Sequence, residues 1–143
     1  MFHDTQNALQ ILDSRQLTCV VCRDNLIYTA TERGVKPLLS WLDQGPSLDG
    51  FCAADRVVGR GAAFLYCLLG VREVYAHVMS RPAAQVLQAH GITHHAGKLV
   101  EGIINRKGTG PCPFEEAVME IQDAPTALIA IREKMRQMQL RKV

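Results

Sequence analysis

The sequence lacks a long hydrophobic run and has little net charge. Its longest apolar stretch, Ala62 to Val71, is about half the length that crosses a bilayer, so no membrane partner is expected. A formal net charge of +2 gives no reason to expect a specific nucleic-acid partner. The residues after Met1 are polar, unlike a secretory signal. We therefore expect a cytoplasmic protein.

The sequence also lacks a disulfide framework. It has five cysteines, an odd number, and their spacing is irregular: Cys19, Cys22, Cys52, Cys67 and Cys112. Reduced thiols are the simplest interpretation. Cys19 and Cys22 have the spacing of a zinc pair, but residues three apart on a strand point to opposite faces. We expect neither a metal nor another cofactor, and His77 and His90 have no identifiable partner.

What is present is the composition of one globular domain. The chain has 143 residues, of which 48% are hydrophobic and 21% are charged. Hydrophobic periodicity and turn residues predict helices over 4–14, 35–44, 54–69, 82–90, 114–121 and 125–141, with a further helical turn within 98–105. They predict strands over 17–22, 26–30, 71–78 and 92–95.

The order of these elements predicts an α/β fold with a mixed sheet. The first two strands are too close in sequence to be parallel, so they form a hairpin. The later strands alternate with helices, which favours parallel pairing. We expect a three-layer α-β-α domain over 1–143, with a core over 17–122.

In such sheets, ligands bind beyond the carboxyl ends of the parallel strands. Three segments are expected there: 52–56, at the start of the longest predicted helix, 79–81 and 105–112. Ser80 and Arg81 leave the third predicted strand, and Glu115 follows the last of these segments.

The segment from Asn105 to Gly110 has the features of an anion-binding loop. Gly108 and Gly110 allow backbone shapes that direct several N–H groups at one anion, and Thr109 lies between them. Arg106 and Lys107 add positive charge. The alternative is a mobile connection with solvated side chains.

Cys112 is the candidate nucleophile. It lies between Pro111 and Pro113 at a predicted helix start, where the pKa of a thiol can be lowered. The alternative is a small buried side chain, which is the usual state of a free cysteine. The other four cysteines lie in apolar segments and are interpreted as packing.

Charged residues of the predicted 54–69 helix complete the candidate site. Asp55 could act as a general acid or base, or only stabilise the helix dipole. Arg56 and Arg60, one helical turn apart, could clamp a phosphate or carboxylate, or face solvent. Gly59 and Gly61 disfavour a helix interior, so another backbone or a ligand is expected to approach closely.

Three stretches resemble a prokaryotic family of uncharacterised function with a cytidine-deaminase-like fold: 54–59, 73–80 and 104–113. The resemblance implies the deaminase fold but no activity.

Zinc deaminases of this fold place His or Cys, one residue and Glu at one helix start, and Pro-Cys-x-x-Cys at the next. This chain has Ala53-Ala54-Asp55 and Ser80-Arg81-Pro82-Ala83 at the positions we compare. Pro111-Cys112-Pro113 matches half of the second motif, one strand too late, so zinc-dependent deamination is not expected.

Three functions remain open. The first is a thiol-dependent hydrolase or transferase, or a remnant of one, acting on a small anionic molecule similar to a nucleotide or nucleoside. The second is a binding or sensing domain without chemistry. The third is a structural or interaction protein, with the basic last helix as a partner surface. A homo-oligomer is compatible with each of them.

Overall fold

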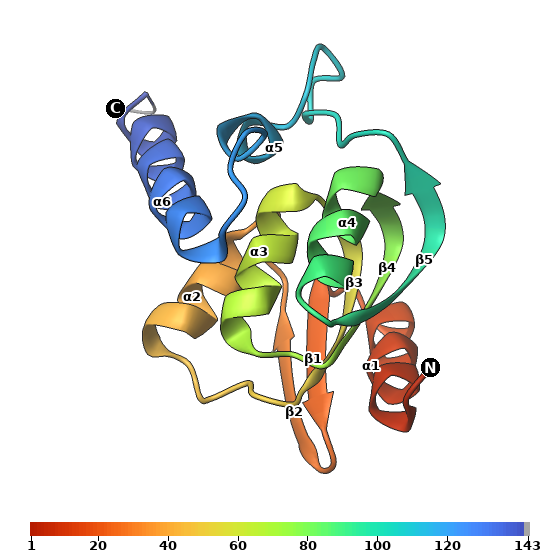
Figure 1. Cartoon of the computed structure of the whole chain (residues 1–143). Helices are drawn as coiled ribbons and strands as arrows, with labels where there is room; N and C mark the ends of the chain where they lie inside the picture. Colours follow the sequence, from red (N-terminus) through yellow and green to blue (C-terminus); the bar gives the residue numbers. More distant parts are fainter. Residues whose placement is uncertain (142–143) are drawn as a thin grey trace.

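The computed structural model describes residues 1–141. Five strands form one sheet, with α1 on one face and the other helices on the opposite face (Figure 1). In chain order the elements are α1 (His3–Ser14), β1 (Cys19–Arg23), β2 (Leu26–Ala30), α2 (Lys36–Gln44), β3 (Cys52–Val58), α3 (Arg60–Leu69), β4 (Glu73–Ser80), α4 (Arg81–Ala89), β5 (Thr93–Val100), α5 (Pro113–Ala117) and α6 (Ala124–Leu140). The predicted α/β class is confirmed.

The sheet has the order β2-β1-β3-β4-β5 and is mixed, as predicted. β1 is antiparallel to both β2 and β3, whereas β3, β4 and β5 are parallel. The β1–β2 turn places Asp24 at a φ of 54°, a conformation that aspartate tolerates better than most residues. As a result, β2 runs in the same direction as β3, β4 and β5. We call the edge where these four strands end the carboxyl rim.

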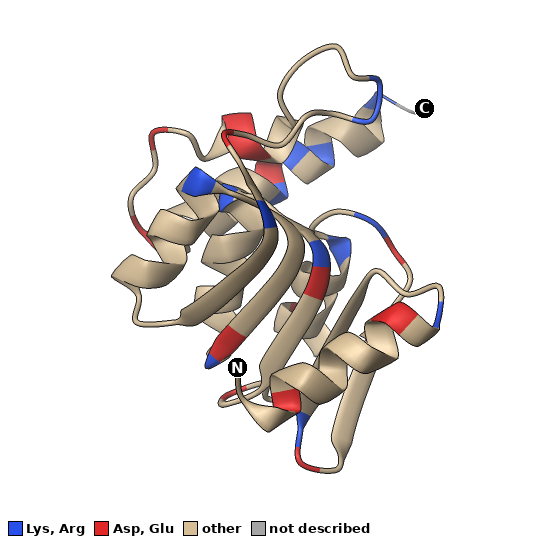
Figure 2. Cartoon of the chain, turned by 90° about the vertical axis from the view of Figure 1, so that its right-hand side faces the viewer, with Lys and Arg blue, Asp and Glu red and all other residues tan. Residues whose placement is uncertain are grey.

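Two apolar layers hold the sheet. The larger lies between the sheet and the helices from α2 onward, and contains the fully buried Phe64, Leu87 and Ile131. The smaller lies under α1 and contains Leu12 and Val20. α1 packs mainly on β1 and β3, so it leaves the outer part of β4 and all of β5 uncovered on that face (Figure 2).

Two helix starts follow local sequence signals. Ser80 accepts a hydrogen bond from the backbone N–H of Ala83 at 3.2 Å, which caps α4. Asp123 does the same for Thr126 at 2.9 Å and caps α6. Both helices have proline in the first turn, where no N–H is needed.

The predicted helix over 54–69 is wrong in its first third. Residues Cys52–Val58 form β3, and the helix begins only at Arg60. The apolar residues of both elements happen to fall at helical spacing. In the fold, β3 is a central strand whose first three residues are buried, and Cys52, Ala53 and Ala54 form an apolar run without the alternation of a half-exposed strand.

The end of the sheet also differs from the prediction. β5 continues to Val100 instead of ending at His95, so the helical turn predicted within 98–105 does not form. α5 covers only Pro113–Ala117. The remaining elements agree with the prediction to within a few residues. Within residues 1–141, no helix combines the length and hydrophobicity needed to cross a membrane.

Candidate functional site

Cys112 is the N-cap residue of α5. Its backbone N–H donates to the carbonyl of Ile103 at 2.8 Å, and its carbonyl accepts from Glu116 at 3.1 Å. The side chain is half-buried. Among residues 1–141, no side chain forms a hydrogen bond with the sulfur. Within the described residues, the structure therefore gives Cys112 a helix start but no acid or base hydrogen-bonded to its sulfur.

Asp55 lies in β3 and directs its carboxylate into a core hydrogen-bond chain. Its Oδ2 accepts a bond of 2.6 Å from the hydroxyl of Tyr66, which in turn lies 3.1 Å from the sulfur of Cys19. The backbone N–H of Val57 donates to Oδ1 at 3.3 Å. Burial raises the pKa of Asp55 to about 6 despite these bonds. No hydrogen bond joins this carboxylate to the 105–112 segment in the described chain.

Arg56 and Arg60 do not lie on one helical face, because Arg56 belongs to β3. The guanidinium of Arg56 donates to the carbonyls of Leu17, Leu12 and Arg15, where α1 ends and β1 approaches. Arg60 donates to carbonyls on the opposite side of the sheet. Its partners are Val118, at 3.0 Å, and Ile121. Each arginine therefore holds a different part of the chain, and the structure does not bring them together as a clamp.

Glu115 occupies the start of α3. Its Oε2 accepts a bond of 2.7 Å from the backbone N–H of Arg60, where a carboxylate stabilises the helix dipole. Its Oε1 is buried and would lie 2.6 Å from a Cβ added at Gly59. A Cβ at Gly61 would lie 3.3 Å from the carbonyl of Phe114. The predicted approach of another backbone is confirmed at Gly61, where it comes from Phe114. Gly59 is the N-cap residue of α3 and not part of its interior, and the side chain of Glu115 approaches it.

The loop 105–110 stands out from the molecule at the carboxyl rim (Figure 1). Three of its six backbone N–H groups bond within the loop: Asn105 to the carbonyl of Gly110, Gly108 to the carbonyl of Asn105, and Thr109 to the Asn105 side chain. These groups are therefore not free to surround an anion. Arg106 and Lys107 are exposed.

Ser80 and Arg81 also have partners inside the fold. Ser80 is buried as the cap of α4, and Arg81 donates to Glu101 at 2.6 Å. Cys52 lies at the amino end of β3, paired with Glu73. It is therefore at the opposite edge of the sheet from Ser80, which corrects the prediction that 52–56 reaches the carboxyl rim.

The corrected boundaries also change the comparison with the deaminase motifs. The helix after the hairpin is α2, with Val35 as its N-cap residue, and the helix after the next strand is α3, with Gly59 as its N-cap residue. The compared segments 53–55 and 80–83 start neither helix. Neither α2 nor α3 starts with His or Cys. Within residues 1–141, no three side chains of His, Cys, Asp or Glu lie close enough to hold a metal ion.

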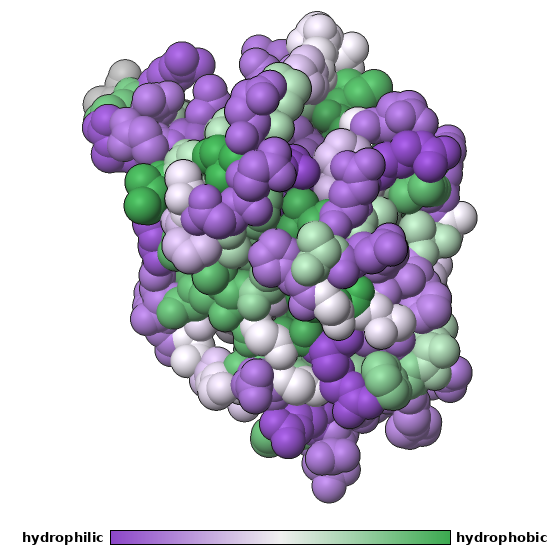
Figure 3. Space-filling view, viewed as in Figure 1, coloured by the Kyte–Doolittle hydropathy of each residue, from purple (hydrophilic) through white to green (hydrophobic). Residues whose placement is uncertain are grey.

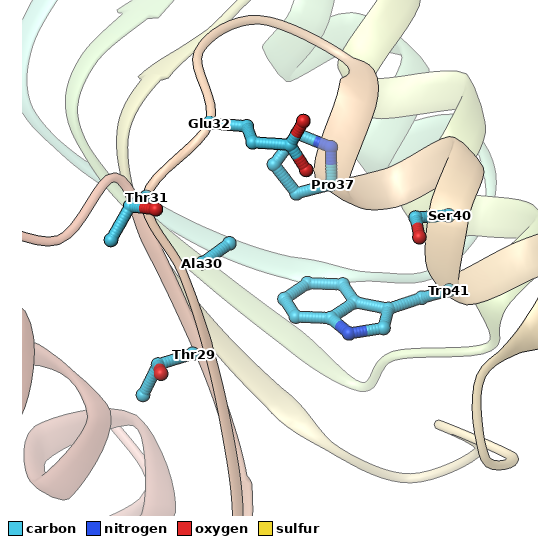
Figure 4. A pocket seen from close by; sticks show the side chains of 7 residues that line it. All are labelled: Thr29, Ala30, Thr31, Glu32, Pro37, Ser40 and Trp41. Atoms are coloured by element: carbon cyan, nitrogen blue, oxygen red, sulfur yellow. The ribbon is translucent and has the colours of Figure 1, made fainter.

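A groove that no sequence pattern predicts lies between β2 and α2. It has a volume of about 350 Å³ and is lined by Thr29, Ala30, Thr31, Glu32, Pro37, Ser40 and Trp41. Figure 4 shows the indole of Trp41 reaching from α2 toward β2, with Glu32 and Pro37 above it. Trp41 and Leu42 also line a neighbouring hollow that ends at Leu68 and Leu69. The surface over α2 and α3 is correspondingly apolar in Figure 3. A single tryptophan in a predicted helix, with no recognisable motif around it, does not indicate such a groove from the sequence alone.

The groove lies at the carboxyl rim, because β2 ends at Ala30 and runs parallel to β3. Ligands of open α/β sheets bind at this edge. The groove has one aromatic wall, Trp41, and the hydroxyl of Ser40 lies beside it on α2. Thr29 and Thr31 line the groove from β2, but their side chains are directed away from Trp41 (Figure 4). The carboxylate of the groove, Glu32, forms an exposed ion pair of 3.5 Å with Lys36.

These features define an α/β domain with a mixed five-stranded sheet and a polar groove at its carboxyl rim. A family model described as TM1506, a domain of unknown function (DUF1893), matches residues 7–135, and the chain belongs to this family. The crystal structure of a DUF1893 family protein (TM1506) from Thermotoga maritima is similar, with a TM-score of 0.85 and 22% identity over 94% of this chain and 92% of that one.

A second solved structure is more distant. It is the dCMP deaminase from the cyanophage S-TIM5 in apo form, with a TM-score of 0.48 and 13% identity. The match covers 70% of this chain and 100% of that one. No curated protein matches the chain at a significant level.

Proposed function

We propose that this domain binds a small planar heterocycle, similar to a nucleoside, in the groove between β2 and α2. The observation that carries the proposal is the pairing of the Trp41 indole with the hydroxyl of Ser40 and the carboxylate of Glu32 in one groove. An indole offers a flat apolar surface on which a ring stacks. Hydroxyl groups and a carboxylate accept hydrogen bonds from ring N–H groups.

The groove favours an uncharged ligand over the anion expected from the sequence. Its charged lining residue is Glu32, which is paired with Lys36, so the groove offers no unpaired positive charge to a phosphate or carboxylate group. The volume of about 350 Å³ lies at the small end of the range for ligand pockets. A ring with one sugar fits this size better than a dinucleotide.

Tryptophan fluorescence tests the proposal directly, because Trp41 is the single tryptophan of the chain. Cytidine, uridine, adenosine and guanosine are titrated separately, and the melting temperature is measured with each. We expect at least one nucleoside to change the fluorescence saturably and to raise the melting temperature, as any ligand of the folded state must. If none of the four does either at millimolar concentration, the proposal is wrong.

A matched pair of variants locates the site. Ser40→Ala removes a groove hydroxyl and should weaken binding about fivefold to tenfold, which is the effect of losing one hydrogen bond. Ser14→Ala, at the end of α1, should leave binding unchanged. Equal effects of the two changes would place the ligand elsewhere.

Thiol chemistry at Cys112 is the second candidate. Its supporting observation is the position of a half-exposed thiol at the start of α5. Iodoacetamide should then label Cys112 faster than it labels glutathione at the same pH. Cys112→Ser should abolish that labelling and leave nucleoside binding intact. Labelling no faster than that of glutathione would remove this candidate alone.

A further inference from the structure

Asp13, His77 and Tyr75 form a line of polar side chains that runs from the end of α1 onto the part of β4 that α1 leaves uncovered. Nε2 of His77 lies 2.7 Å from Oδ1 of Asp13, at the end of α1. Nδ1 of the same ring lies 3.3 Å from the hydroxyl of Tyr75. Tyr75 and His77 are two residues apart on β4, so both side chains point to the same face. This line is separated from the β2–α2 groove by the sheet.

The chemistry of the three groups sets the proton arrangement of the neutral His77 ring. An ionised carboxylate only accepts hydrogen bonds, so Nε2 of His77 carries the proton that faces Asp13. In the neutral imidazole, Nδ1 then has a free lone pair. The hydroxyl of Tyr75 donates to it. A carboxylate, an imidazole and a hydroxyl in this order are the arrangement that activates serine in hydrolases, with tyrosine here in the place of serine.

Two of the three side chains are open to solvent, and Tyr75 is half-buried. The side chains of Asp13 and His77 are 52% and 33% exposed. α1 does not extend over β5, the strand beside Tyr75 (Figure 2). The neighbouring residue His95 is directed to Glu73, at 3.3 Å, and so does not compete for the Tyr75 hydroxyl.

Gly97 provides the room for the hydroxyl. A Cβ at this position would lie 3.0 Å from the Tyr75 oxygen and 2.9 Å from the carbonyl of His77. Glycine weakens a strand interior, and in a strand it often marks a close approach. Here the missing side chain lets the Tyr75 hydroxyl lie beside β5 within reach of His77.

We propose that Tyr75 is a nucleophile that accepts an acyl group from an activated ester, with His77 as the general base and Asp13 as a positioning residue. The phenol oxygen forms a bond to the carbonyl carbon of the ester, and its proton passes to Nδ1 of His77. The bond between that carbon and the leaving oxygen breaks, and the leaving group departs as an alkoxide or phenolate. His77 then returns the proton to the leaving group, which leaves an acyl-tyrosine.

The other tyrosines of the chain serve as internal controls for the reactivity of Tyr75. It has three tyrosines: Tyr75, the half-buried Tyr28 and the fully buried Tyr66. The protein is treated with p-nitrophenyl acetate, and acetylation of each tyrosine is followed by peptide mass spectrometry. We expect Tyr75 to react at least about tenfold faster than Tyr28, because a positioned base accelerates proton transfer by that factor or more. Acetylation of Tyr75 no faster than that of Tyr28 would overturn the proposal.

Two variants separate activation from simple exposure. His77→Gln keeps a side chain of similar size and should bring the Tyr75 to Tyr28 rate ratio close to one. Asp13→Asn lies at an exposed helix end and should lower the ratio several-fold without unfolding the protein. Asp43→Asn, an exposed change on α2, is the matched control and should leave the ratio unchanged. A ratio that stays at the wild-type value in both His77→Gln and Asp13→Asn would show that exposure alone governs the reaction.

Discussion

Asp55, Arg56, Arg60 and Glu115 are charged side chains whose hydrogen bonds go to the protein itself. Asp55 bonds to Tyr66, the two arginines to backbone carbonyls, and Glu115 to the start of α3. Buried or half-buried charges need such partners, because an unpaired charge in the interior is costly. At the residue scale, a charge near a predicted rim is therefore no evidence of a ligand until its internal partners are known.

Asp55 should make stability depend on pH. Folding raises its pKa from 3.8 to about 6, so between these values the native state holds a proton that the unfolded chain has lost. The contribution of Asp55 to the free energy of unfolding is therefore largest below about pH 4 and is lost as the pH rises through about 6. Asp55→Asn does not titrate and should be more stable than wild type at pH 7, by on the order of 2 kcal/mol. Urea unfolding from pH 4 to 8 measures this.

A second aspartate gives a control of opposite sign. Hydrogen bonding to Arg132 lowers the pKa of Asp43, so this residue stabilises the fold above its unfolded pKa and loses that effect as the pH falls. Asp43→Asn should therefore leave the fall between pH 4 and 6 in place. If Asp55→Asn shows the same fall as wild type, the assignment to Asp55 is wrong.

Sequence reasoning located some features of the candidate site and missed others for a physical reason. The close approach at Gly61 was predictable, because glycine is unfavourable in a helix and often marks a place where another group comes near. Sequence reasoning could not identify Glu115 as the partner of Gly59, because that contact depends on how α5 packs against α3. The same holds for His77, which had no partner in sequence and lies beside Asp13 only because α1 crosses the sheet.

At the scale of elements, the junction of β3 and α3 depends on the fit between Gly59 and Glu115. Gly59→Ala would place a methyl group 2.6 Å from Oε1 and force the carboxylate away from the N–H of Arg60. We expect a loss of about 1–3 kcal/mol, the usual result of overpacking, measured by urea unfolding. Gly102→Ala is the matched control, since nothing lies within 4 Å of its added Cβ.

A double-mutant cycle tests the cause of that loss. Glu115→Ala removes the carboxylate that the methyl group would strike. In the Glu115→Ala background, Gly59→Ala should cost clearly less than it does in the wild type, because contacting residues are coupled. Strictly additive losses would mean that the backbone of Gly59, and not the contact with Glu115, sets the penalty.

The elements differ in how well the sequence predicts them. The hairpin, α4 and α6 are marked by local signals: a short turn in the first case, and a capping residue followed by proline in the others. β3 has no such signal. Its residues 52–58 continue into the apolar α3, and the boundary is set by tertiary packing on both faces of the sheet.

At the scale of the molecule, two arginines hold opposite parts of the chain to the sheet. Arg56 holds the end of α1, and Arg60 holds the segment between α5 and α6. Arg60→Met should increase amide hydrogen exchange over 113–123 and leave 11–18 unchanged. Arg56→Met should do the reverse, because each change leaves buried carbonyls without donors on one side only. Uniformly faster exchange in both variants would show that the arginines support the whole fold instead.

β5 is the last strand of the sheet, and its outer backbone N–H and C=O groups have no strand partner within residues 1–141. An open edge of eight residues is a template for pairing with other chains, and natural proteins guard such edges with lysine. Lys98, exposed near the middle of the strand, is in the position to do this. Lys98→Thr should therefore increase light scattering on concentration, whereas Lys107→Thr, with the same loss of charge in the 105–110 loop, should not. Colloidal behaviour in this protein would then depend on one side chain at a sheet margin rather than on its overall charge.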